Sequence, residues 1–320
     1  MTDLSTTTRL FDLIHFLTDL GERQGQKEKD AGDFLTTMLV RNHLPFVCEP
    51  FETVYPTFPS WILEVDHQSI SSQPTCFVGG QSDARPRILS SLDSFDGDIG
   101  VPIINHNPDC PHVISRPHCY PSLALAVCTD DLPSIISGTL FHLAADVRKT
   151  IHQSRNILVG NLENPRRILF AHYDSLGPGA VDNASGVVIL LHALLTTPEI
   201  SQKDLCIFVG NEEISFDTPC HWGHGYRMFE SGHRDQLCTA KQLVVIDCVG
   251  HERAEFLHDL DLLRMGLPLQ DIEQYLGKTM ALTASFAKLM AFYHSPMDTI
   301  DQIYPEYLLE ALAYVTQARF

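Results

Sequence analysis

Apolar residues recur at helical spacing in two stretches near the start of the chain. Leu10, Ile14 and Leu17 share one face after a threonine-rich segment, and residues 31–39 repeat the pattern. A face of this kind packs against a core while its polar neighbours remain in water. We therefore predict two amphipathic helices within residues 1–56.

The pattern changes between residues 57 and 150, where prolines are frequent and the apolar runs are short. Turn-forming residues separate these runs, and proline disrupts the interior of a helix. The segment 57–150 is therefore predicted to form a smaller, strand-rich insert.

From residue 151 to residue 320 short apolar runs alternate with helical patterns. Arg167–Ala171, Leu205–Gly210 and Gln242–Cys248 have the length and composition of buried strands. The segments Gly186–Leu195 and Tyr226–Glu230 lie between them and show helical spacing. Alternation of this kind predicts an α/β fold, with a mostly parallel sheet and helices on both faces.

Composition narrows the function mainly by exclusion. The formal net charge of -18 argues against a nucleic-acid partner, because such proteins concentrate Lys and Arg against phosphate. The first residues lack the basic and apolar parts of a signal peptide, and no apolar run reaches the length of a membrane span. Nine cysteines without a Cys-x-x-Cys pair do not indicate a disulfide framework. We therefore expect a cytoplasmic protein with no membrane partner.

Ionisable side chains follow the predicted strands and two further apolar or small-residue segments. Sites in open α/β sheets form at the carboxyl ends of the strands, so these side chains are expected to converge there. One such residue alone is more often a cap or a turn residue. A set of imidazoles and carboxylates on one rim instead suits a pair of zinc ions. The candidate ligands are His172, Asp182, Glu213, Asp247 and His294.

Two adjacent glutamates, Glu212 and Glu213, end the second of these strands. Neighbouring residues that leave a strand point in different directions, so one carboxylate can hold a metal while the other faces the attacking water. This division of roles is what hydrolysis requires. One of the two glutamates is therefore a candidate general base.

Five short segments of the chain occur in an order that is familiar from a known family. They are 172–175 (His-Tyr-Asp-Ser), 179–186 (Gly-Ala-Val-Asp-Asn-Ala-Ser-Gly), 211–213 (Asn-Glu-Glu), 245–247 (Val-Ile-Asp) and 293–299 (Tyr-His-Ser-Pro-Met-Asp-Thr). In order and spacing they resemble the zinc aminopeptidases that include bacterial leucyl aminopeptidases, with glutamate carboxypeptidase and glutaminyl cyclase as relatives. The resemblance covers about residues 156–312.

The resemblance implies two Zn²⁺ per chain and assigns a role to each candidate. Asp182 would bridge the metals, His172 and Asp247 would complete one of them, and Glu213 and His294 the other. Glu212 would act as the base for a hydroxide held between the two zincs. The role of Asp174 would be to fix the tautomer of the first histidine. The insert 57–150 resembles a protease-associated domain, and residues 1–56 and 151–320 would form the catalytic domain.

The expected activity is that of a metallo-exopeptidase, most simply an aminopeptidase acting on a peptide or aminoacyl substrate. A carboxypeptidase, a dipeptidase or a single-zinc glutaminyl cyclase of the same fold are alternatives. An interaction protein that has lost its metal is an alternative from another class. Residues 214–225 depart from the family pattern, so the preferred side chain and peptide length stay open. The native metal and the oligomeric state also stay open.

Two other groups of residues suggest chemistry less strongly. The insert contains His106, Cys110, His112, His118 and Cys119, which fit no common zinc spacing, so loop residues are the preferred interpretation. His221 and His224 flank a tryptophan and could reach a substrate pocket, although a surface turn is the simpler interpretation.

Overall fold

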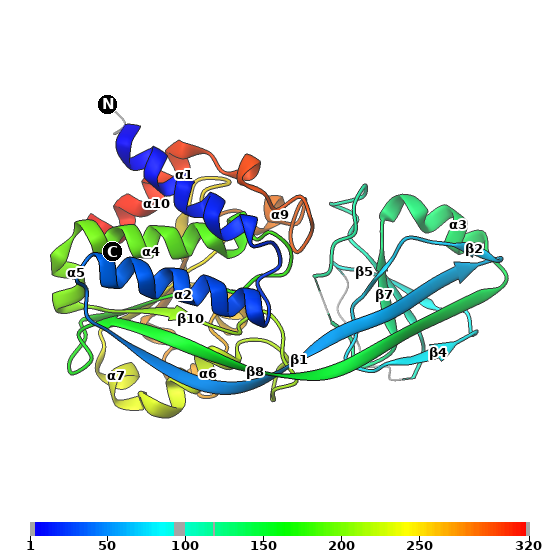
Figure 1. Ribbon diagram of the computed structural model, residues 1–320, viewed down its shortest axis with the longest axis horizontal. Coiled ribbons are helices and arrows are strands. Elements are labelled where there is room, and N and C mark those ends of the chain that lie inside the picture. Colours follow the sequence, from blue (N-terminus) through cyan, green and yellow to red (C-terminus); the bar gives the residue numbers. More distant parts are fainter. Residues whose placement is uncertain (1–3, 93–99, 118, 318–320) are drawn as a thin grey trace. The chain divides into compact units, whose positions relative to one another are not determined.

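The computed structural model describes residues 4–92, 100–117 and 119–317, and the chain forms two compact units (Figure 1). The first unit comprises residues 1–53, 152–285 and 298–320. The second unit comprises residues 54–151 and 286–297. The segment 286–297, which the sequence analysis placed in the catalytic domain, thus groups with the second unit.

The larger sheet contains the three strands that the sequence predicted. Its strand order is β12-β13-β11-β9-β10-β8-β1-β2, where β2 is Gln68–Ser69. Four neighbouring strands, β13, β11, β9 and β10, run parallel, whereas β12 and β8 are antiparallel to their neighbours. The bounds are β1 (Phe46–Val65), β8 (Phe141–Gly160), β9 (Arg167–His172), β10 (Leu205–Val209), β11 (Gln242–Ile246), β12 (Glu255–Leu257) and β13 (Thr279–Thr283).

Helices cover both faces of this sheet in the first unit (Figure 1). On one side lie α1 (Leu4–Asp19), α2 (Gln26–Arg41), α4 (Gly186–Thr196) and α10 (Pro305–Gln317). On the other lie α6 (His224–Gly232) and α7 (Arg234–Thr239). The predicted α/β architecture is confirmed, and β9 and β10 are buried at every position because helices pack on both faces. The shorter helices α5 (Pro198–Lys203) and α8 (Leu260–Gly266) complete this unit.

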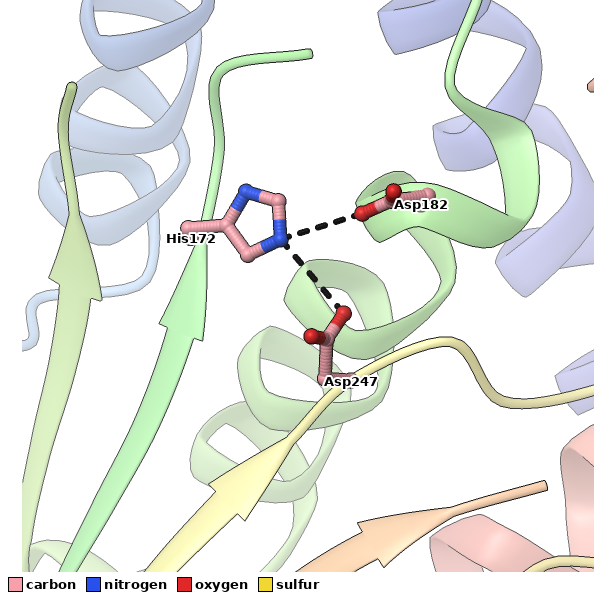
Figure 2. A group of neighbouring side chains, drawn as sticks. All are labelled: His172, Asp182 and Asp247. Carbon is pink, nitrogen blue, oxygen red and sulfur yellow. Dashed lines mark ion pairs between the residues drawn. The ribbon is translucent and has the colours of Figure 1, made fainter. Parts of the chain in front are cut away.

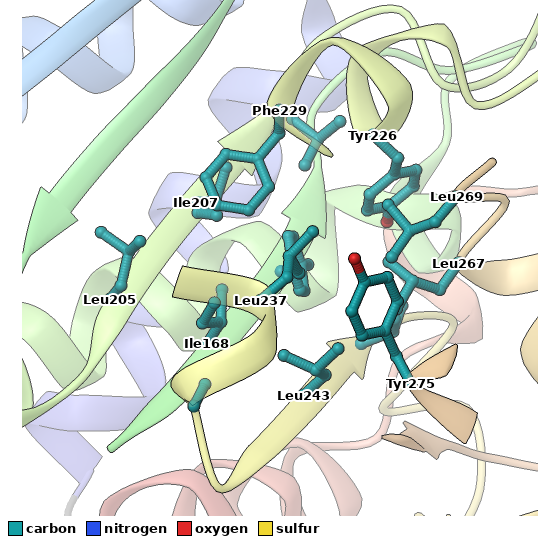
Figure 3. Packing of buried hydrophobic residues seen from close by; sticks show 14 of the residues in the cluster. Ile168, Leu205, Ile207, Tyr226, Phe229, Leu237, Leu243, Leu267, Leu269 and Tyr275 are labelled. Carbon is teal, nitrogen blue, oxygen red and sulfur yellow. The ribbon is translucent and has the colours of Figure 1, made fainter. Parts of the chain in front are cut away.

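The core on the α6 side of the sheet is shown in Figure 3. Alternate residues of the strands, such as Ile168 and Phe170 of β9, point into it, since successive side chains of a strand face opposite sides. Tyr226 and Phe229 of α6 place their rings edge-on against Phe170. This packing holds the carboxyl ends of the central strands in fixed positions.

The second unit is built around a smaller sheet of order β3-β7-β6-β5, in which β5, β6 and β7 run parallel. These strands are β3 (Gln73–Pro74), β5 (Arg87–Ser90), β6 (Ile103–His106) and β7 (Ala124–Val127). The short strands β2 (Gln68–Ser69) and β4 (Gly80–Ser82) pair with β1 and β8, and the helices are α3 (Leu132–Ser137) and α9 (Phe286–Leu289).

The segment 286–297 is tied to the second unit by backbone groups. Asn107 donates from its side-chain amide to the carbonyl of Met290 at 2.8 Å, and Ser115 donates from its hydroxyl to the carbonyl of Tyr293 at 2.7 Å. The amide of Arg116 donates to the carbonyl of His294 at 3.0 Å. Across the described ranges of the chain, no helix combines the length and apolar character needed to cross a bilayer.

Candidate metal centre

Three predicted ligands meet at the carboxyl edge of the parallel strands (Figure 2). His172 is the last residue of β9, Asp247 follows β11, and Asp182 lies in the turn before α4. The Nε2 atom of His172 is 3.2 Å from Oδ1 of Asp182 and 3.4 Å from Oδ1 of Asp247. One imidazole nitrogen and two carboxylate oxygens thus face a common point.

The turn that carries Asp182 is held from two directions. Asn183 donates from its side-chain amide to the carbonyl of Ile246 at 2.8 Å, which ties the turn to the end of β11. Asp298 accepts from the backbone amides of Val181 at 2.8 Å and Asp182 at 3.1 Å. These contacts fix Asp182, a predicted ligand, before the first turn of α4.

Asp174 links the first histidine to the two glutamates. Its Oδ1 lies 3.6 Å from Nδ1 of His172, which is the geometry of a carboxylate that orients an imidazole. The same carboxylate accepts from the backbone amides of Glu212 and Glu213, each at 2.9 Å. Asp174 is fully buried, so its carboxylate depends on protein groups such as these for its hydrogen bonds.

Glu213 lies beside Asp182, as a ligand of a second metal would require. Their carboxylate oxygens are within 4.8 Å of each other, and Oε1 of Glu213 accepts from the amide of Leu176 at 3.2 Å. His294 belongs to the segment 286–297 of the second unit, and its part in a metal site stays a prediction.

The charges of the site shift two pKa values away from their usual range. Burial alone would lower the pKa of His172, but hydrogen bonds to Asp174, Asp182 and Asp247 outweigh it and hold that pKa well above its usual value. Burial also raises the pKa of Glu212; the His172 imidazole opposes this, and the neighbouring carboxylates of Glu213, Asp174 and Asp247 add to it. A carboxyl group with a raised pKa is suited to take up and return a proton near neutral pH.

These side chains fit a divalent cation. The carboxylates that favour a proton on His172 would also favour a metal cation at the same nitrogen. A proton and a metal cation both reduce the repulsion among the buried negative charges. The donor set of imidazole nitrogen and carboxylate oxygens is one that zinc accepts in catalytic sites. Asp182 forms one group of potential ligands with His172 and Asp247, and it also lies within reach of Glu213.

Two residues of the site were missed in the sequence analysis. Asp298 lies in the last family-like segment, but no role was assigned to it. Arg23 stands in a polar stretch between the first two predicted helices, where a surface position would be expected, yet it is fully buried. Burial lowers the pKa of Arg23 to about 10, while the nearby carboxylates of Asp174, Asp298, Glu213 and Asp182 act in the opposite direction.

Three of the cysteines and histidines singled out in the insert contact protein groups. His106 contacts the hydroxyl of Thr129 at 3.1 Å, and His112 pairs with Asp130 at 2.8 Å. Cys110 donates to the hydroxyl of Ser295 at 3.8 Å. Cys119 belongs to no potential metal-binding group within the described parts of the chain, and His118 lies outside them.

His221 and His224 belong to the segment whose sequence departs from the family. Nδ1 of His224 lies 2.7 Å from Asp217, which also binds Arg227 through two nitrogens at 2.9 and 2.7 Å. The carbonyl of His221 accepts from the amide of Ser215 at 2.8 Å. These contacts connect the two ends of the loop 215–224. They give His224 a structural role, which does not require contact with a substrate.

Part of the chain matches a known protein family. Residues 157–216 match peptidase family M28, and this segment contains His172, Asp174, Asp182, Glu212 and Glu213. The predicted family resemblance is therefore confirmed for this part of the chain. No curated protein sequence matches the chain.

Solved structures share the fold over nearly the full length. A zinc aminopeptidase from Bacillus subtilis aligns with a TM-score of 0.70 at 16% identity, covering 98% of this chain and 93% of that one. A peptidase M28 precursor from Shewanella amazonensis gives 0.68 at 15% identity, covering 98% and 94%. A glutaminyl cyclase from Porphyromonas gingivalis gives 0.51 at 14% identity, covering 98% and 96%. At the level of the family, these findings support a metallo-exopeptidase, a zinc-binding hydrolase that acts on peptides.

Proposed function

We propose that the protein is an aminopeptidase that uses two Zn²⁺ per chain to remove N-terminal residues from peptides. The observation that carries the proposal is the position of Asp182, which groups with His172 and Asp247 and also with Glu213. In this proposal Asp182 would be shared by the two metals, His172 and Asp247 would hold one of them, and Glu213 and His294 would hold the other.

Zinc, when bound, would lower the pKa of a water molecule and polarise the scissile carbonyl. The carboxylate of Glu212 takes up the proton of the attacking water and later returns it to the nitrogen of the leaving amine. Its raised pKa, which burial and the surrounding carboxylates cause, supports this role. Asp174 keeps the imidazole of His172 oriented and fixes the backbone amides of both glutamates.

Negative charge favours a substrate with a free amino terminus over one with a free carboxylate. The carboxylates at the site are Asp174, Asp182, Glu212, Glu213, Asp247 and Asp298, and two divalent cations together with Arg23 offset only part of this charge. A protonated or metal-bound α-amino group of the substrate would be attracted to the remaining carboxylates. The zinc aminopeptidase from Bacillus subtilis, which shares the fold, supports the same assignment.

The central test is the substitution Glu212→Gln, which keeps the shape of the side chain and removes its ability to exchange a proton. We expect the turnover of aminoacyl reporter substrates to fall roughly 100- to 10,000-fold while zinc stays bound. Zinc content is measured on the same samples by elemental analysis. Unchanged turnover with zinc still bound would show that Glu212 is not the base.

Metal stoichiometry separates the proposed activity from its nearest alternative. We expect close to two zinc ions per chain and release of free amino acids from unblocked peptides. One zinc per chain with conversion of N-terminal glutamine to pyroglutamate would instead identify a glutaminyl cyclase. No zinc binding at all would favour an interaction protein.

A further inference from the structure

Arg23 is a buried cation in the loop between α1 and α2. Its side chain is inaccessible to solvent, although the residues around it in the sequence are polar. A buried guanidinium is costly unless its N–H groups are satisfied and its charge is compensated. Arg23 meets both requirements at the edge of the metal centre.

Its N–H groups donate to four backbone carbonyls. Nε donates to Tyr173 at 2.8 Å, and Nη2 donates to Gly179 at 3.0 Å. Nη1 is shared between Pro178 at 2.6 Å and Leu17 at 3.3 Å. The backbone adds two weaker contacts with Ser175, at 3.3 and 3.4 Å.

The positions of these carbonyls along the chain matter. Tyr173 directly follows the ligand His172, and Gly179 lies three residues before the ligand Asp182. One guanidinium therefore forms hydrogen bonds to both ends of the loop that connects the two proposed ligands. Gly179 has a left-handed backbone (φ 59°), and a Cβ there would come within 2.9 Å of Nη2, so the loop closes tightly on the arginine.

The charge of Arg23 acts on the same site. The carboxylates of Asp174, Asp298, Glu213 and Asp182 are close enough to stabilise its positive charge. By the same interaction the guanidinium reduces the repulsion among these carboxylates. A pKa of about 10 leaves Arg23 charged at neutral pH.

We propose that Arg23 is a positioning residue that sets the metal affinity of the centre, by holding the loop 173–179 between His172 and Asp182 in place and by offsetting the charge of the site. The inference rests on the proposed metal site. It does not depend on which peptide is cleaved. A planar fork that bonds several carbonyls at once is specific to arginine, whereas lysine supplies the charge from a single nitrogen.

The test compares Arg23→Lys and Arg23→Gln with a matched control, Arg167→Lys. Arg167 is also buried and also lies in the first unit, where it pairs with Asp204 at 2.5 Å. It begins the strand that His172 ends, roughly 16 Å away at the usual rise per residue. Each variant is made in the full chain, and its folding is checked by circular dichroism and urea unfolding.

Two readouts are taken that do not require turnover. Zinc affinity is measured by competition with a chromogenic chelator, and the visible absorption spectrum is recorded after loading with Co²⁺. We expect both Arg23 variants to bind zinc roughly 10- to 100-fold more weakly than the wild type, by analogy with other residues that support ligands. Their Co²⁺ spectra should change in position or intensity. Arg167→Lys should match the wild type in both measurements.

Several outcomes would overturn the inference. Folded Arg23 variants with wild-type zinc affinity and spectra would do so, and so would an equal loss of affinity in Arg167→Lys. Failure of both Arg23 variants to fold, with Arg167→Lys folded, would show that Arg23 serves the core and not the metal. A wild-type chain that binds no metal would instead contradict the proposed function, so the two failures are distinguishable.

Discussion

At the residue scale, Asp174 is the side chain on which several parts of the metal centre depend. It faces Nδ1 of His172 and accepts from the amides of Glu212 and Glu213. Gln24 adds a further contact by donating to Oδ2 at 3.2 Å. Its carboxylate therefore positions two proposed ligands and the proposed base at once, without itself being one of the proposed metal ligands.

The substitution Asp174→Asn tests this position. An asparagine has only one acceptor oxygen, so it must leave at least one of the two glutamate amides without its present partner. We expect zinc affinity to fall roughly 10- to 100-fold, as for other residues that orient a ligand. Chelator competition measures the change. Asp83→Asn, at a largely exposed carboxylate paired with His142, is the control and should bind zinc like the wild type.

Glu28 is a buried carboxyl group outside the metal centre. It lies 3.3 Å from Nε2 of His152 and accepts from the hydroxyl of Ser154. Burial raises the pKa of Glu28; His152 and Ser154 act against this, and the charge of Asp174 adds to it. The folded protein therefore holds a proton on this group more tightly than the unfolded chain does.

This shift predicts how Glu28→Gln changes stability with pH. The contribution of Glu28 to stability is fully present below the pKa that it has in the unfolded chain, about 4.3. It is lost as the pH rises through the higher pKa of the folded protein. Glutamine does not titrate, so the Glu28→Gln variant does not lose this stability. Between the two pKa values its free energy of unfolding should rise relative to that of the wild type, by at most about 1.4 kcal/mol per pH unit. Urea unfolding at pH 5 and pH 7.5 measures the difference. Parallel pH profiles for the two proteins would contradict the prediction.

At the scale of single elements, the start of α4 lies against the end of β11. A Cβ at Gly186 would be 2.5 Å from the carbonyl oxygen of Ile246 and even closer to the side chain of Asn183. The glycine thus allows the helix to begin directly beside the strand that leads to Asp247. This close approach sets the separation of two proposed ligands, because Asp182 precedes the helix.

The substitution Gly186→Ala should therefore destabilise the fold. Alanine favours a helix by up to about 1 kcal/mol, but a clash with the backbone of a central strand costs more. We expect a net loss of roughly 1–3 kcal/mol in the free energy of unfolding, as for other overpacked positions. Gly232→Ala in α6 is the control, because a Cβ there meets no atom within 4 Å and should be neutral or stabilising. Equal stability of both variants would refute this account.

The elements that were predicted well are those whose burial produces a simple pattern of apolar residues in the sequence. β9 and β10 are apolar or buried throughout, as a strand covered on both faces requires. β1 was not recognised as one strand, because it contains Pro50, Pro56 and Pro59 and the insert was predicted to begin at residue 57. Proline is tolerated in a strand at positions where no neighbouring strand needs its N–H as a donor. The spacing of apolar residues does not reveal which positions these are.

The site could be predicted only where its residues fall in recognisable local segments. His172, Asp182 and Asp247 were identified in this way, and the structure brings their side chains together. Arg23 was not, since its partners Tyr173 and Gly179 lie about 150 residues away and offer backbone carbonyls, which carry no sequence signal. A buried arginine is indistinguishable from a surface one until its contacts are known.

For the whole molecule, metal binding should add directly to stability. A ligand that binds only the folded state stabilises it by about 2.7 kcal/mol at a free concentration 100 times its Kd. We expect the thermal unfolding midpoint to rise with zinc and to fall after treatment with a chelator. Asp247→Asn, which removes one proposed ligand, should lose most of the zinc-dependent rise. An equal rise in both proteins would mean that zinc acts elsewhere.

Asp298 adds a consequence for the order in which the protein matures. Its carboxylate closes the turn of Val181 and Asp182 from 117 and 116 residues further along the chain. On the ribosome, that turn lacks its acceptor until Asp298 has emerged. A partly synthesised chain would thus carry most of the candidate ligands without a finished site. The turn that carries Asp182 is therefore completed only after residue 298 has been made.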